Sequence, residues 1–370
     1  MNWKVRYVDY PTAFRKMERE IMLTIRQVFE GGDLILRQHV QEFEQHLAQF
    51  VGTPFAIGVN SGTDALHLSL RAVGIGPGDE VITVSHTFVA TAAAIHHAGA
   101  TPVLVDIGDD HNMDVSLVEQ AITPRTRAII PVHLNGRVCD MERLMAIAQR
   151  HSLLVIEDAA QALGATFKGR KAGSFGVAGC FSFYPAKVLG AFGDAGAVVT
   201  NDPQVAQRLR WLRNHGRTED GDTAFFAFNS RLDNLHAAIL DLKLRKVPEW
   251  IAYRRHLARL YQRYLADIPY LRLPPPPVEE GPYWDVYQNY EIEAERRDAL
   301  VTHLKEDGIE VMLPWGGKAV HQFKALGLSH FPLPKTEEVF RRVLMLPMHT
   351  ELTEEHIAYV AQSIRAFYNR

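Results

Sequence analysis

The chain has 370 residues, of which 47% are hydrophobic and 22% charged, as is typical of a globular protein with one large and one smaller domain. Its formal net charge of -3, from interspersed acids and bases, excludes the basic field that nucleic acid or an anionic membrane requires. No stretch is long and apolar enough to span a membrane and the first residues lack a signal-peptide pattern, so we expect a cytoplasmic protein with small-molecule substrates.

Helical and strand-like patterns alternate along the chain. Between residues 12 and 50 apolar side chains recur at helical spacing and residues 31–33 (Gly-Gly-Asp) interrupt the pattern, so we expect two helices joined by a turn. Short β-rich runs follow, with amphipathic segments between them: residues 81–84, 102–106, 128–132, 153–156, 180–183 and 196–200. Buried strands separated by helices indicate an α/β protein with a mainly parallel sheet, whose functional residues gather at the carboxyl ends of the strands.

The pattern changes towards the C-terminus. Residues 234–247 predict a helix that leads into a long polar helix, and four prolines follow at residues 274–277. We place a domain boundary near Pro248, between a large domain (residues 1–247) and a small one (residues 248–370), with the N-terminal helices able to pack on the small domain. The proline run could bind a partner, but we interpret it as a stiff loop of the small domain.

Residues 60–68, Asn-Ser-Gly-Thr-Asp-Ala-Leu-His-Leu, place a small hydroxyl-bearing turn at the start of an apolar helix. Unpaired backbone N–H groups and the helix dipole favour an anion there, so Gly62 and Thr63 are candidates for a phosphate seat. Ser61 or Thr63 could instead simply cap the helix. The turn alone does not decide between the two interpretations.

Asp158 follows the apolar run at residues 153–156, so we expect its carboxylate at the sheet edge where ligands bind. Beside the ring of pyridoxal phosphate (PLP), such a carboxylate keeps the pyridine nitrogen protonated, and the ring can then accept electrons from a carbanion. Gln161 lies three residues further on and reaches the ring hydroxyl if a helix begins here. A plain helix cap is the alternative interpretation of these residues.

Lys187 ends the segment Phe-Ser-Phe-Tyr-Pro-Ala-Lys and precedes a glycine-rich turn, one strand beyond Asp158. Apolar neighbours such as Val188 lower the pKa of a lysine and expose its lone pair. Such an amine holds PLP as a Schiff base and, once displaced, carries a proton between the substrate and cofactor carbons. Ser182 could add a hydrogen bond to the phosphate. The alternative is a solvated surface lysine, as most lysines are.

Neither cysteine nor histidine patterns predict a metal site. Cys139 and Cys180, the only cysteines, have small or apolar neighbours and are expected to be buried thiols. His133, His215 and His321 lie too far apart in the sequence to show a ligand spacing, so we expect structural or substrate-contacting roles for them and no metal.

Six ordered motifs resemble the DegT/StrS-type nucleotide-sugar aminotransferases. They are residues 61–66 (Ser-Gly-Thr-Asp-Ala-Leu), 78–82 (Gly-Asp-Glu-Val-Ile), 87–91 (Thr-Phe-Val-Ala-Thr), 131–134 (Pro-Val-His-Leu), 157–161 (Glu-Asp-Ala-Ala-Gln) and 181–187. The match runs from about Phe14 to Leu244 and is loose in the C-terminal third. It implies PLP fold type I, as in aspartate aminotransferase: a homodimer whose large domain has a mainly parallel seven-stranded sheet and whose smaller C-terminal domain is α+β. It also implies amino transfer from L-glutamate to a nucleotide-linked keto-deoxysugar, with pyridoxamine phosphate as the intermediate.

The resemblance implies a role for each matching residue. Lys187 would bind PLP covalently, Asp158 would pair with the pyridine nitrogen, and Gln161 would contact the ring oxygen. The remaining implied cofactor contacts are Phe88, which would stack on the ring, the phosphate ligands Gly62, Thr63 and Ser182, and Asn229, which would reach the phosphate in the neighbouring subunit so that active sites are shared.

The chain departs from the family pattern where the substrate is concerned. Val188 stands where the family commonly has asparagine, and residues 226–229 lack the usual glycine before Asn-x-Arg. Residues 314–321, Pro-Trp-Gly-Gly-Lys-Ala-Val-His, replace a tyrosine-proline and proline-leucine-histidine segment that many relatives carry near the sugar. The turn at residues 189–194 resembles members that act on carbon 3 of the sugar more than those that act on carbon 4. The candidates for substrate contacts are Tyr184, Arg231, Trp315, Lys318 and His321, although a packed tryptophan and a solvated lysine are alternatives.

Other functions compete with this interpretation. A cyclitol aminotransferase acting on a keto-inositol would share the PLP motifs and stays open. A sugar dehydratase of the same family typically has histidine in place of Lys187, and a non-catalytic scaffold would have lost Lys187 or Asp158. We therefore predict an aminotransferase for amino sugars of a surface polysaccharide, such as the O-antigen of lipopolysaccharide, or of a glycosylated natural product.

Overall fold

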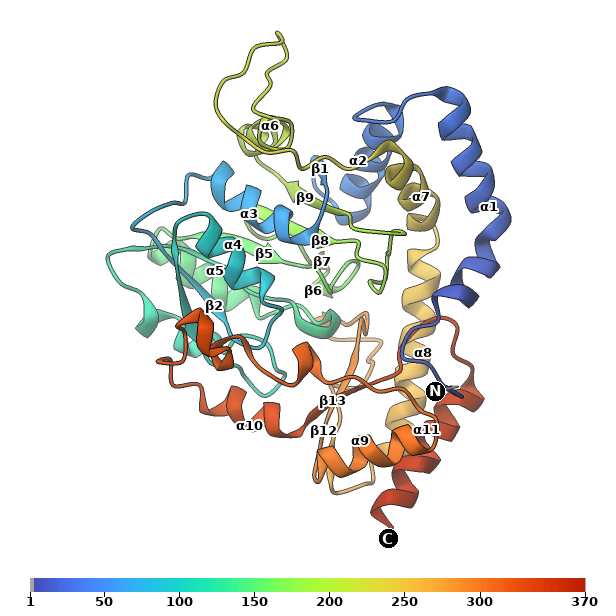
Figure 1. Ribbon diagram of the computed structural model, residues 1–370. Helices are drawn as coiled ribbons and strands as arrows, with labels where there is room; N and C mark the ends of the chain where they lie inside the picture. The colour runs from blue at the N-terminus through green and yellow to red at the C-terminus, as the bar shows by residue number, and fades with distance from the viewer. Residues whose placement is uncertain (1–2, 370) are drawn as a thin grey trace.

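The computed structural model describes residues 3–369, which fold around a central seven-stranded sheet with helices on both faces (Figure 1). In spatial order its strands are β1 (Phe55–Val59), β9 (Gly196–Thr200), β8 (Ala178–Ser182), β5 (Leu154–Asp158), β4 (Thr126–Ile129), β2 (Glu80–Val84) and β3 (Thr101–Val105). Strand β9 is antiparallel to both of its neighbours, and the other neighbouring pairs are parallel. The predicted α/β fold with a mainly parallel seven-stranded sheet is confirmed.

Two small antiparallel sheets and a set of helices complete the described chain. The small sheets are β10 (Leu271–Arg272), β12 (Tyr290–Ala294) and β13 (Val343–Leu346), and β11 (Tyr283–Trp284), β6 (Thr166–Phe167) and β7 (Arg170–Lys171). The α-helices are α1 (Tyr10–Gly31), α2 (Gln38–Val51), α3 (Gly62–Ala72), α4 (Ala90–His97), α5 (Met141–Arg150), α6 (Pro203–Leu212), α7 (Asn234–Leu244), α8 (Val247–Leu265), α9 (Arg297–Glu306), α10 (Pro334–Arg342) and α11 (Glu354–Tyr368). Short 3-10 turns are η1 (Val115–Leu117), η2 (Glu119–Ala121), η3 (Leu134–Gly136), η4 (Pro314–Gly316), η5 (Val320–Gln322) and η6 (Lys324–Leu326).

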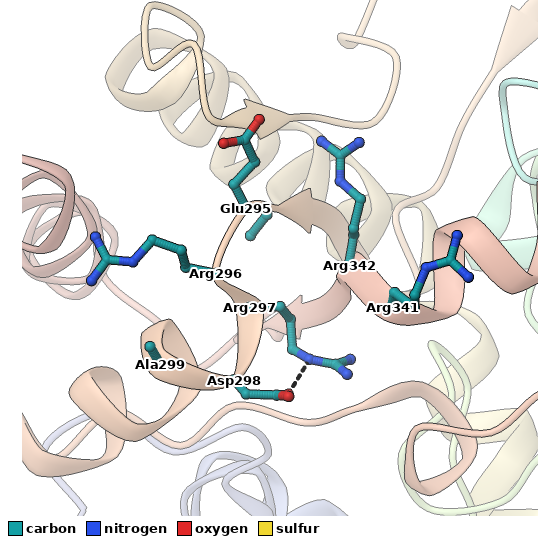
Figure 2. A pocket seen from close by; sticks show the side chains of 8 residues that line it. Glu295, Arg296, Arg297, Asp298, Ala299, Arg341 and Arg342 are labelled. Carbon is teal, nitrogen blue, oxygen red and sulfur yellow. Dashed lines mark hydrogen bonds and ion pairs between the residues drawn. The ribbon is translucent and has the colours of Figure 1, made fainter.

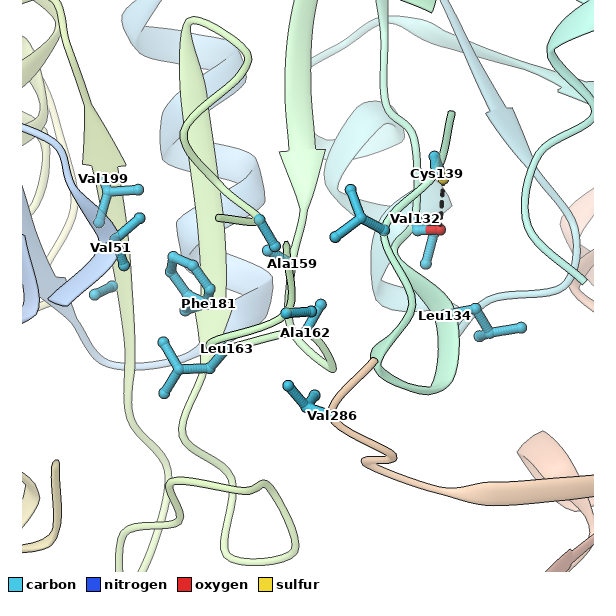
Figure 3. Packing of buried hydrophobic residues seen from close by; sticks show 14 of the residues in the cluster. Val51, Val132, Leu134, Cys139, Ala159, Ala162, Leu163, Phe181, Val199 and Val286 are labelled. Carbon is cyan, nitrogen blue, oxygen red and sulfur yellow. Dashed lines mark hydrogen bonds between the residues drawn. The ribbon is translucent and has the colours of Figure 1, made fainter. Parts of the chain in front are cut away.

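Neighbouring residues of each central strand enter two different hydrophobic cores. Val81 and Cys180 belong to the core under α3, α4 and α6, whereas Ile82 and Phe181 belong to the core under α2, α5 and α7 (Figure 3). Because side chains alternate between the faces of a strand, a sheet covered on both faces needs apolar residues at every position. This explains why continuous apolar runs, rather than alternating ones, predicted these strands.

Strand β1 was not predicted. It forms an edge of the sheet, where the outward-facing backbone N–H and C=O groups have no neighbouring strand to bond with. Here the N–H of Gly58 donates to Glu44 Oε1 (2.7 Å) and its carbonyl accepts from Arg213 Nη1 (2.7 Å), so two side chains satisfy the edge. A side chain at position 58 would collide with Leu232, whose Cδ2 would lie 2.8 Å from the added Cβ.

The C-terminal part of the chain has a core of its own, made of residues 257–367 together with Val5. Val5 pairs with Ile309, so it is the segment before α1 that joins this core, while α1 and α2 lie against α7. The domain division after residue 247 stays a prediction. Helix α8 begins at Val247 and contributes side chains to both cores, which would make it the connection between the two domains.

Both cysteines are buried, and Cys139 Sγ lies 3.1 Å from the carbonyl oxygen of Val132 (Figure 3). Burial raises the pKa of both thiols, which keeps them unreactive at neutral pH. The proline run at residues 274–277 forms a loop whose carbonyls accept hydrogen bonds from Gln262 and Tyr287, as expected for a structural loop. Among the described helices, none combines the length and apolarity needed to cross a bilayer.

Candidate active site

The structure brings Asp158 and Lys187 to one edge of the central sheet. Asp158 is the last residue of β5, not a residue beyond the strand as predicted, and it lies in register with Cys180 of β8. Strand β8 ends at Ser182, and Lys187 occupies the turn that follows. The two side chains are close enough for each charge to affect the pKa of the other. As predicted, the carboxylate and the amine therefore lie at neighbouring strand ends of one sheet.

Burial lowers the pKa of Lys187 to about 8, and the negative charge of Asp158 only partly opposes this shift. Roughly a tenth of the amine is thus unprotonated, and nucleophilic, at pH 7, far more than for an ordinary lysine. Lys187 also lines a cavity of about 360 Å³, together with residues of α1, the turn after Tyr184 and the segment near Glu351. The amine therefore combines a partly desolvated environment with a space that a small molecule can occupy.

The pKa of Lys187 can be tested on the apoprotein. We expect its labelling by a trace of acetic anhydride to rise roughly tenfold per pH unit up to a pH of about 8 and then to level off, because only the neutral amine reacts. An ordinary lysine levels off only above about pH 10. Peptide mass spectrometry measures the labelling at each position. A plateau for Lys187 above pH 10 would contradict the assigned burial.

Asp158 is held in place by neighbouring donors. Thr91 Oγ1 donates to one carboxylate oxygen (2.8 Å) and the N–H of Ala160 to the other (3.2 Å), and Thr87 contacts the Thr91 hydroxyl (2.7 Å). Burial raises the pKa of Asp158, although these hydrogen bonds and the Lys187 charge oppose the shift. A carboxylate in this setting is ready to receive a cationic N–H partner, which would stabilise its charged form.

Gln161 does not lie on a helix, so the helix that would have directed its side chain to the ring hydroxyl is absent. Residues 159–165 form successive turns, in which Ala159 accepts from the N–H of Ala162 (2.9 Å). The side chain is nevertheless buried near the site, and its Oε1 accepts from the N–H of Asn135 (2.6 Å) and from Asn289 Nδ2 (3.4 Å). These two asparagines orient Gln161, and their distance in sequence hid them from the motif analysis.

The turn at residues 61–63 both caps α3 and forms a cradle. Ser61 Oγ accepts from the N–H of Asp64 (3.1 Å), so the capping interpretation is correct for Ser61. A Cβ added to Gly62 would lie 2.7 Å from Ser182 Cβ, so only glycine lets the start of α3 approach the end of β8 this closely. Among the described residues, no protein acceptor meets the N–H groups of Gly62 and Thr63. Two free donors and a serine hydroxyl fit a phosphate.

Three aromatic residues were predicted to contact the cofactor or the substrate. Phe88 follows β2, is 54% exposed, and lies with its ring centroid 5.7 Å from that of Trp315. Trp315 sits in η4 with its indole N–H buried and, among the described residues, without a hydrogen-bond partner. Tyr184 is 52% exposed beside Lys187 and lines the same cavity. An exposed ring at Phe88 is available for stacking on a planar ligand.

Lys318 and His321, two further predicted substrate contacts, differ in their exposure to solvent. Lys318 is exposed. His321 is buried, and its Nδ1 lies 2.6 Å from Ser85 Oγ, which connects residues 314–321 to the loop that carries Phe88. Its role as a substrate contact stays a prediction.

Asn229 and Arg231 lie away from Lys187. Asn229 is exposed in the segment that follows α6, which Figure 1 shows as a loop projecting from the body of the protein. Its backbone pairs with Asn214, and Arg231 Nη1 donates to the side chain of Asn214 (3.3 Å). No contact within residues 3–369 joins Asn229 to Asp158 or Lys187.

Sequence reasoning missed Gln288, which holds the Lys187 turn from the C-terminal part of the chain. Its Oε1 accepts from the N–H of Val188 (2.7 Å) and its Nε2 donates to the carbonyl of Ala186 (2.8 Å). The side chain thus bonds the residues on both sides of Lys187. Its position 100 residues further along the chain gives no local signal.

Glu157, next to Asp158, is a fully buried anchor that the motif analysis left without a role. Its carboxylate accepts from the backbone N–H groups of Gly173, Phe175 and Gly176 (2.7 Å each) and lies 2.9 Å from His133 Nε2. Four partners satisfy the buried charge and fix the loop that leads into β8. His133, one of the histidines considered for a metal, is thereby assigned a structural contact.

We expect Glu157→Gln to lower the free energy of unfolding by about 3 kcal/mol, because an amide has one acceptor oxygen and places N–H donors against N–H donors. Urea unfolding followed by circular dichroism measures this. As a control, Glu142→Gln removes an exposed carboxylate paired with Lys168 and should change stability by less than about 0.5 kcal/mol. Equal stabilities of the two variants would show that the Glu157 network does not stabilise the fold.

A second hollow, of about 620 Å³, lies between the start of α9 and the end of α10 and is lined by Arg296, Arg297, Arg341 and Arg342 among others (Figure 2). Arg296 and Arg341 point away from each other, and Arg297 pairs with Asp298 (2.5 Å). Its arginines do not converge on a common point. The site at the carboxyl ends of β5 and β8 is therefore the better candidate.

Comparison with known proteins identifies the family. The sequence model of the DegT/DnrJ/EryC1/StrS aminotransferase family matches residues 15–365. The chain belongs to this family. Because its aminotransferases depend on PLP, the DegT-family chain is a PLP-dependent transaminase, and the resemblance and cofactor predicted from the motifs are confirmed.

Similar proteins extend over nearly the whole chain. One is the dTDP-3-amino-3,4,6-trideoxy-alpha-D-glucose transaminase of Streptomyces venezuelae, 41% identical over 99% of this chain and 97% of that protein. Another is the UDP-N-acetyl-3-dehydro-alpha-D-glucosamine 3-aminotransferase of Acidithiobacillus ferrooxidans, 42% identical over 98% of both chains. The crystal structure of DesV from S. venezuelae in complex with a ketimine intermediate superposes with a TM-score of 0.95 at 42% identity, covering 99% of both chains. The fold of these enzymes is thus the fold of this DegT-family chain.

Proposed function

We propose that this DegT-family transaminase transfers the amino group of L-glutamate to carbon 3 of a nucleotide-linked keto-deoxysugar. The observation that carries the proposal is the proximity of Lys187 and Asp158 beside the α3 cradle, in a chain similar to a dTDP-linked and a UDP-linked 3-amino sugar transaminase. Those two relatives differ in the nucleoside, so we leave the nucleoside open. We place the enzyme in the cytoplasm, in the synthesis of amino sugars for a surface polysaccharide or a glycosylated natural product.

The residues at the site fit PLP. We assign the phosphate to the free N–H groups of Gly62 and Thr63 and to Ser182, the pyridine nitrogen to Asp158, and the ring oxygen to Gln161. Two observations support this assignment: the buried carboxylate of Asp158, which accepts from Thr91 and Ala160 and has no ion pair among the described residues, and the cradle that a Cβ at position 62 would fill. Phe88 would cover one face of the ring. When bound, PLP supplies an electron-accepting ring that stabilises negative charge on a carbon next to the amine.

The chain's own groups then have separate tasks. Asp158, held by Thr91 and Ala160, would keep a proton on the pyridine nitrogen of bound PLP, because its carboxylate is fixed and shielded from water. The Lys187 amine, with its pKa lowered to about 8, accepts a proton from the substrate carbon and returns it on the other side of the reaction. Gln288 fixes the turn on both sides of that amine, so that Nζ stays in reach of both positions.

Substrate assays test the proposal directly. With glutamate as donor, we expect turnover of a dTDP- or UDP-linked 3-keto sugar, and slower or no turnover of the 4-keto isomer and of a keto-inositol. Because one site serves both half-reactions, labelled 2-oxoglutarate should exchange into glutamate without any sugar present. Preferential amination of the 4-keto sugar or of the keto-inositol would overturn the substrate assignment while leaving the transaminase assignment in place.

We further propose a homodimer in which Asn229 enters the partner's site. The loop after α6 projects from the body (Figure 1), and Phe226, on the arm of the loop that leads back to Asn229, is fully exposed, as expected for a segment that packs against another chain. Asn229 is exposed on the same loop and has no contact with the site of its own chain among the described residues. A second subunit would give both residues a partner.

We expect Asn229→Ala to weaken PLP binding about tenfold, since one hydrogen bond to a charged phosphate is lost. Equilibrium dialysis against PLP measures the affinity. Mixing this variant with Lys187→Ala protein should restore part of the activity, because one site of each hybrid dimer has both residues intact. Asn201→Ala, at another exposed asparagine, should leave affinity unchanged. Hybrids that form without any recovery would contradict a shared site.

A further inference from the structure

The side chains of two histidines and one glutamate, from three segments far apart in the sequence, lie close together beside the loop that carries Phe88. His86 follows β2, His111 lies in the turn after β3, and Glu291 lies on β12. One potential ligand atom from each of the three side chains lies within 4.8 Å of the other two. Among the described residues, this is the one group of side chains arranged so that it could hold a metal ion. The cluster is separate from the PLP site, and the inference does not depend on the proposed sugar substrate.

His86 has a buried ring whose one close polar neighbour among the described residues is Glu291. Its side chain is 0% exposed, and neither Nδ1 nor Nε2 makes a hydrogen bond within the described residues. Nε2 points towards Glu291 Oε2 at 3.4 Å, while Phe340 packs on the ring with centroids 4.7 Å apart. Burying an imidazole whose nitrogens make no hydrogen bond is costly, so a ligand that binds these nitrogens would stabilise the fold. Next to a carboxylate, the group that suits an imidazole lone pair is a cation.

The charges around the cluster also leave room for a cation. Glu293 lies 3.4 Å from Arg272 Nη1 and 3.9 Å from Arg342 Nε, which compensate its charge. Among residues 3–369, only His86 and His111 lie within ion-pairing distance of Glu291, whose side chain is 2% exposed. With both imidazoles neutral, one buried negative charge remains without compensation, and burying it that way is unfavourable. Either a proton on an imidazole or a metal ion must supply the positive charge.

Glu293 sets up His111 as a ligand. His111 Nε2 lies 3.2 Å from Glu293 Oε1, and Nδ1 lies 2.8 Å from Glu291 Oε1. If Nε2 carries the proton and donates it to Glu293, the lone pair of Nδ1 faces Glu291. A carboxylate that fixes the tautomer of a ligating histidine in this way is a recurrent feature of metal sites.

We propose that His86, His111 and Glu291 bind one divalent transition-metal ion, with Zn²⁺ as the best match and Glu293 as the residue that positions His111. Two imidazole nitrogens and a carboxylate are zinc ligands at ~2.0–2.2 Å, whereas Mg²⁺ and Ca²⁺ prefer oxygen ligands alone. A cavity of about 40 Å³ borders His111 and Glu291 and can hold one water as a fourth ligand. No metal was predicted from the sequence because only His133, His215 and His321 were considered as ligands.

The ion would connect the active site to the C-terminal sheet. His86 lies two residues before Phe88 and five before Thr91, which holds Asp158, whereas Glu291 belongs to β12. His321 bonds the neighbouring Ser85, so the same loop is held from the C-terminal part at a second point. A metal at the cluster would therefore stabilise the loop that carries Phe88, without taking part in the amino transfer.

The experiment measures bound metal in the PLP-loaded enzyme. Protein treated with EDTA and then freed of it is incubated with ZnCl₂ or CoCl₂, gel-filtered, and analysed by inductively coupled plasma mass spectrometry and visible absorption. We expect about one Zn²⁺ per chain, a Tm higher by several degrees with Zn²⁺ than after EDTA, and visible absorption of low-symmetry Co²⁺. Less than a tenth of an equivalent, with no Co²⁺ absorption, would overturn the proposal and leave a protonated imidazole as the source of charge.

Matched variants locate the bound ion. His111→Asn keeps a residue that tolerates the left-handed backbone (φ 65) and should lose more than tenfold in zinc affinity, as should Glu291→Gln. The control His215→Asn changes an exposed histidine with the same kind of backbone (φ 60) and should bind zinc as the unchanged protein does. Unchanged zinc content in both cluster variants would overturn the assignment. Should they fail to fold, the Co²⁺ spectrum and stoichiometry of the unchanged protein decide.

Discussion

Lys187→Ala is expected to lower kcat by at least ~10⁴-fold while the protein still folds and still binds PLP. The amine acts twice, as the covalent anchor and as the group that moves the proton, and no second lysine is placed against Asp158 among the described residues. PLP binding should persist because the phosphate cradle and Asp158 are unchanged. Steady-state turnover, together with cofactor content after gel filtration, measures both parts.

The matched control is Lys171→Ala. Burial also lowers the pKa of Lys171, but its amine donates to the carbonyl of Phe50, away from the strand ends that form the site. Turnover should stay within a few-fold of the original in this variant. Near-normal amino transfer by Lys187→Ala would contradict the roles of the Lys187 amine in cofactor binding and proton transfer. A variant that no longer binds PLP would show that the cradle and Asp158 do not hold the cofactor without the lysine.

Asp158→Asn is expected to lower kcat by ~10²–10³-fold and to lower the free energy of unfolding by about 1 kcal/mol. The amide keeps an oxygen that can accept from Thr91 but places its nitrogen against the N–H of Ala160, and it carries no charge to hold a proton on its partner nitrogen. The unprotonated ring then withdraws electrons less well. Single-turnover rates with glutamate alone isolate this effect from sugar binding and from product release.

Asp241→Asn provides the comparison, since Asp241 is also a largely buried carboxylate but contacts His46 and Arg245 on the α2–α7 side. Its effect should be limited to stability, measured by thermal unfolding. If Asp158→Asn kept more than half of the single-turnover rate, Asp158 would have no electronic role, and its burial beside Lys187 would need a purely structural explanation.

The elements with continuous apolar runs could be predicted from sequence because burial on both faces leaves a strong local signal. Strand β1 could not, since Gly58 interrupts its run and its edge is satisfied by Glu44 and Arg213, which are distant in sequence. Its pairing with β9 likewise joins residues far apart in the chain.

The site shows the same limit. Lys187 and Asp158 were found because each follows a strand and carries its chemistry in a single side chain. The helix expected at Gln161 is absent because Gly164, with φ 87, and successive turns lead the chain back towards β6. Sequence spacing gives no signal for contacts between residues far apart in the chain. Such contacts form the hydrogen bonds of Gln288 and Asn289 and the cluster of His86, His111 and Glu291.

The central claim is that the Lys187 amine bonds reversibly to PLP. The most direct measurement is to treat the PLP-loaded enzyme with borohydride, digest it, and locate the reduced cofactor by peptide mass spectrometry. We predict a single pyridoxyl group on Lys187, and none when glutamate is added before reduction. Labelling of another lysine, or of none at all in the absence of glutamate, would contradict this account.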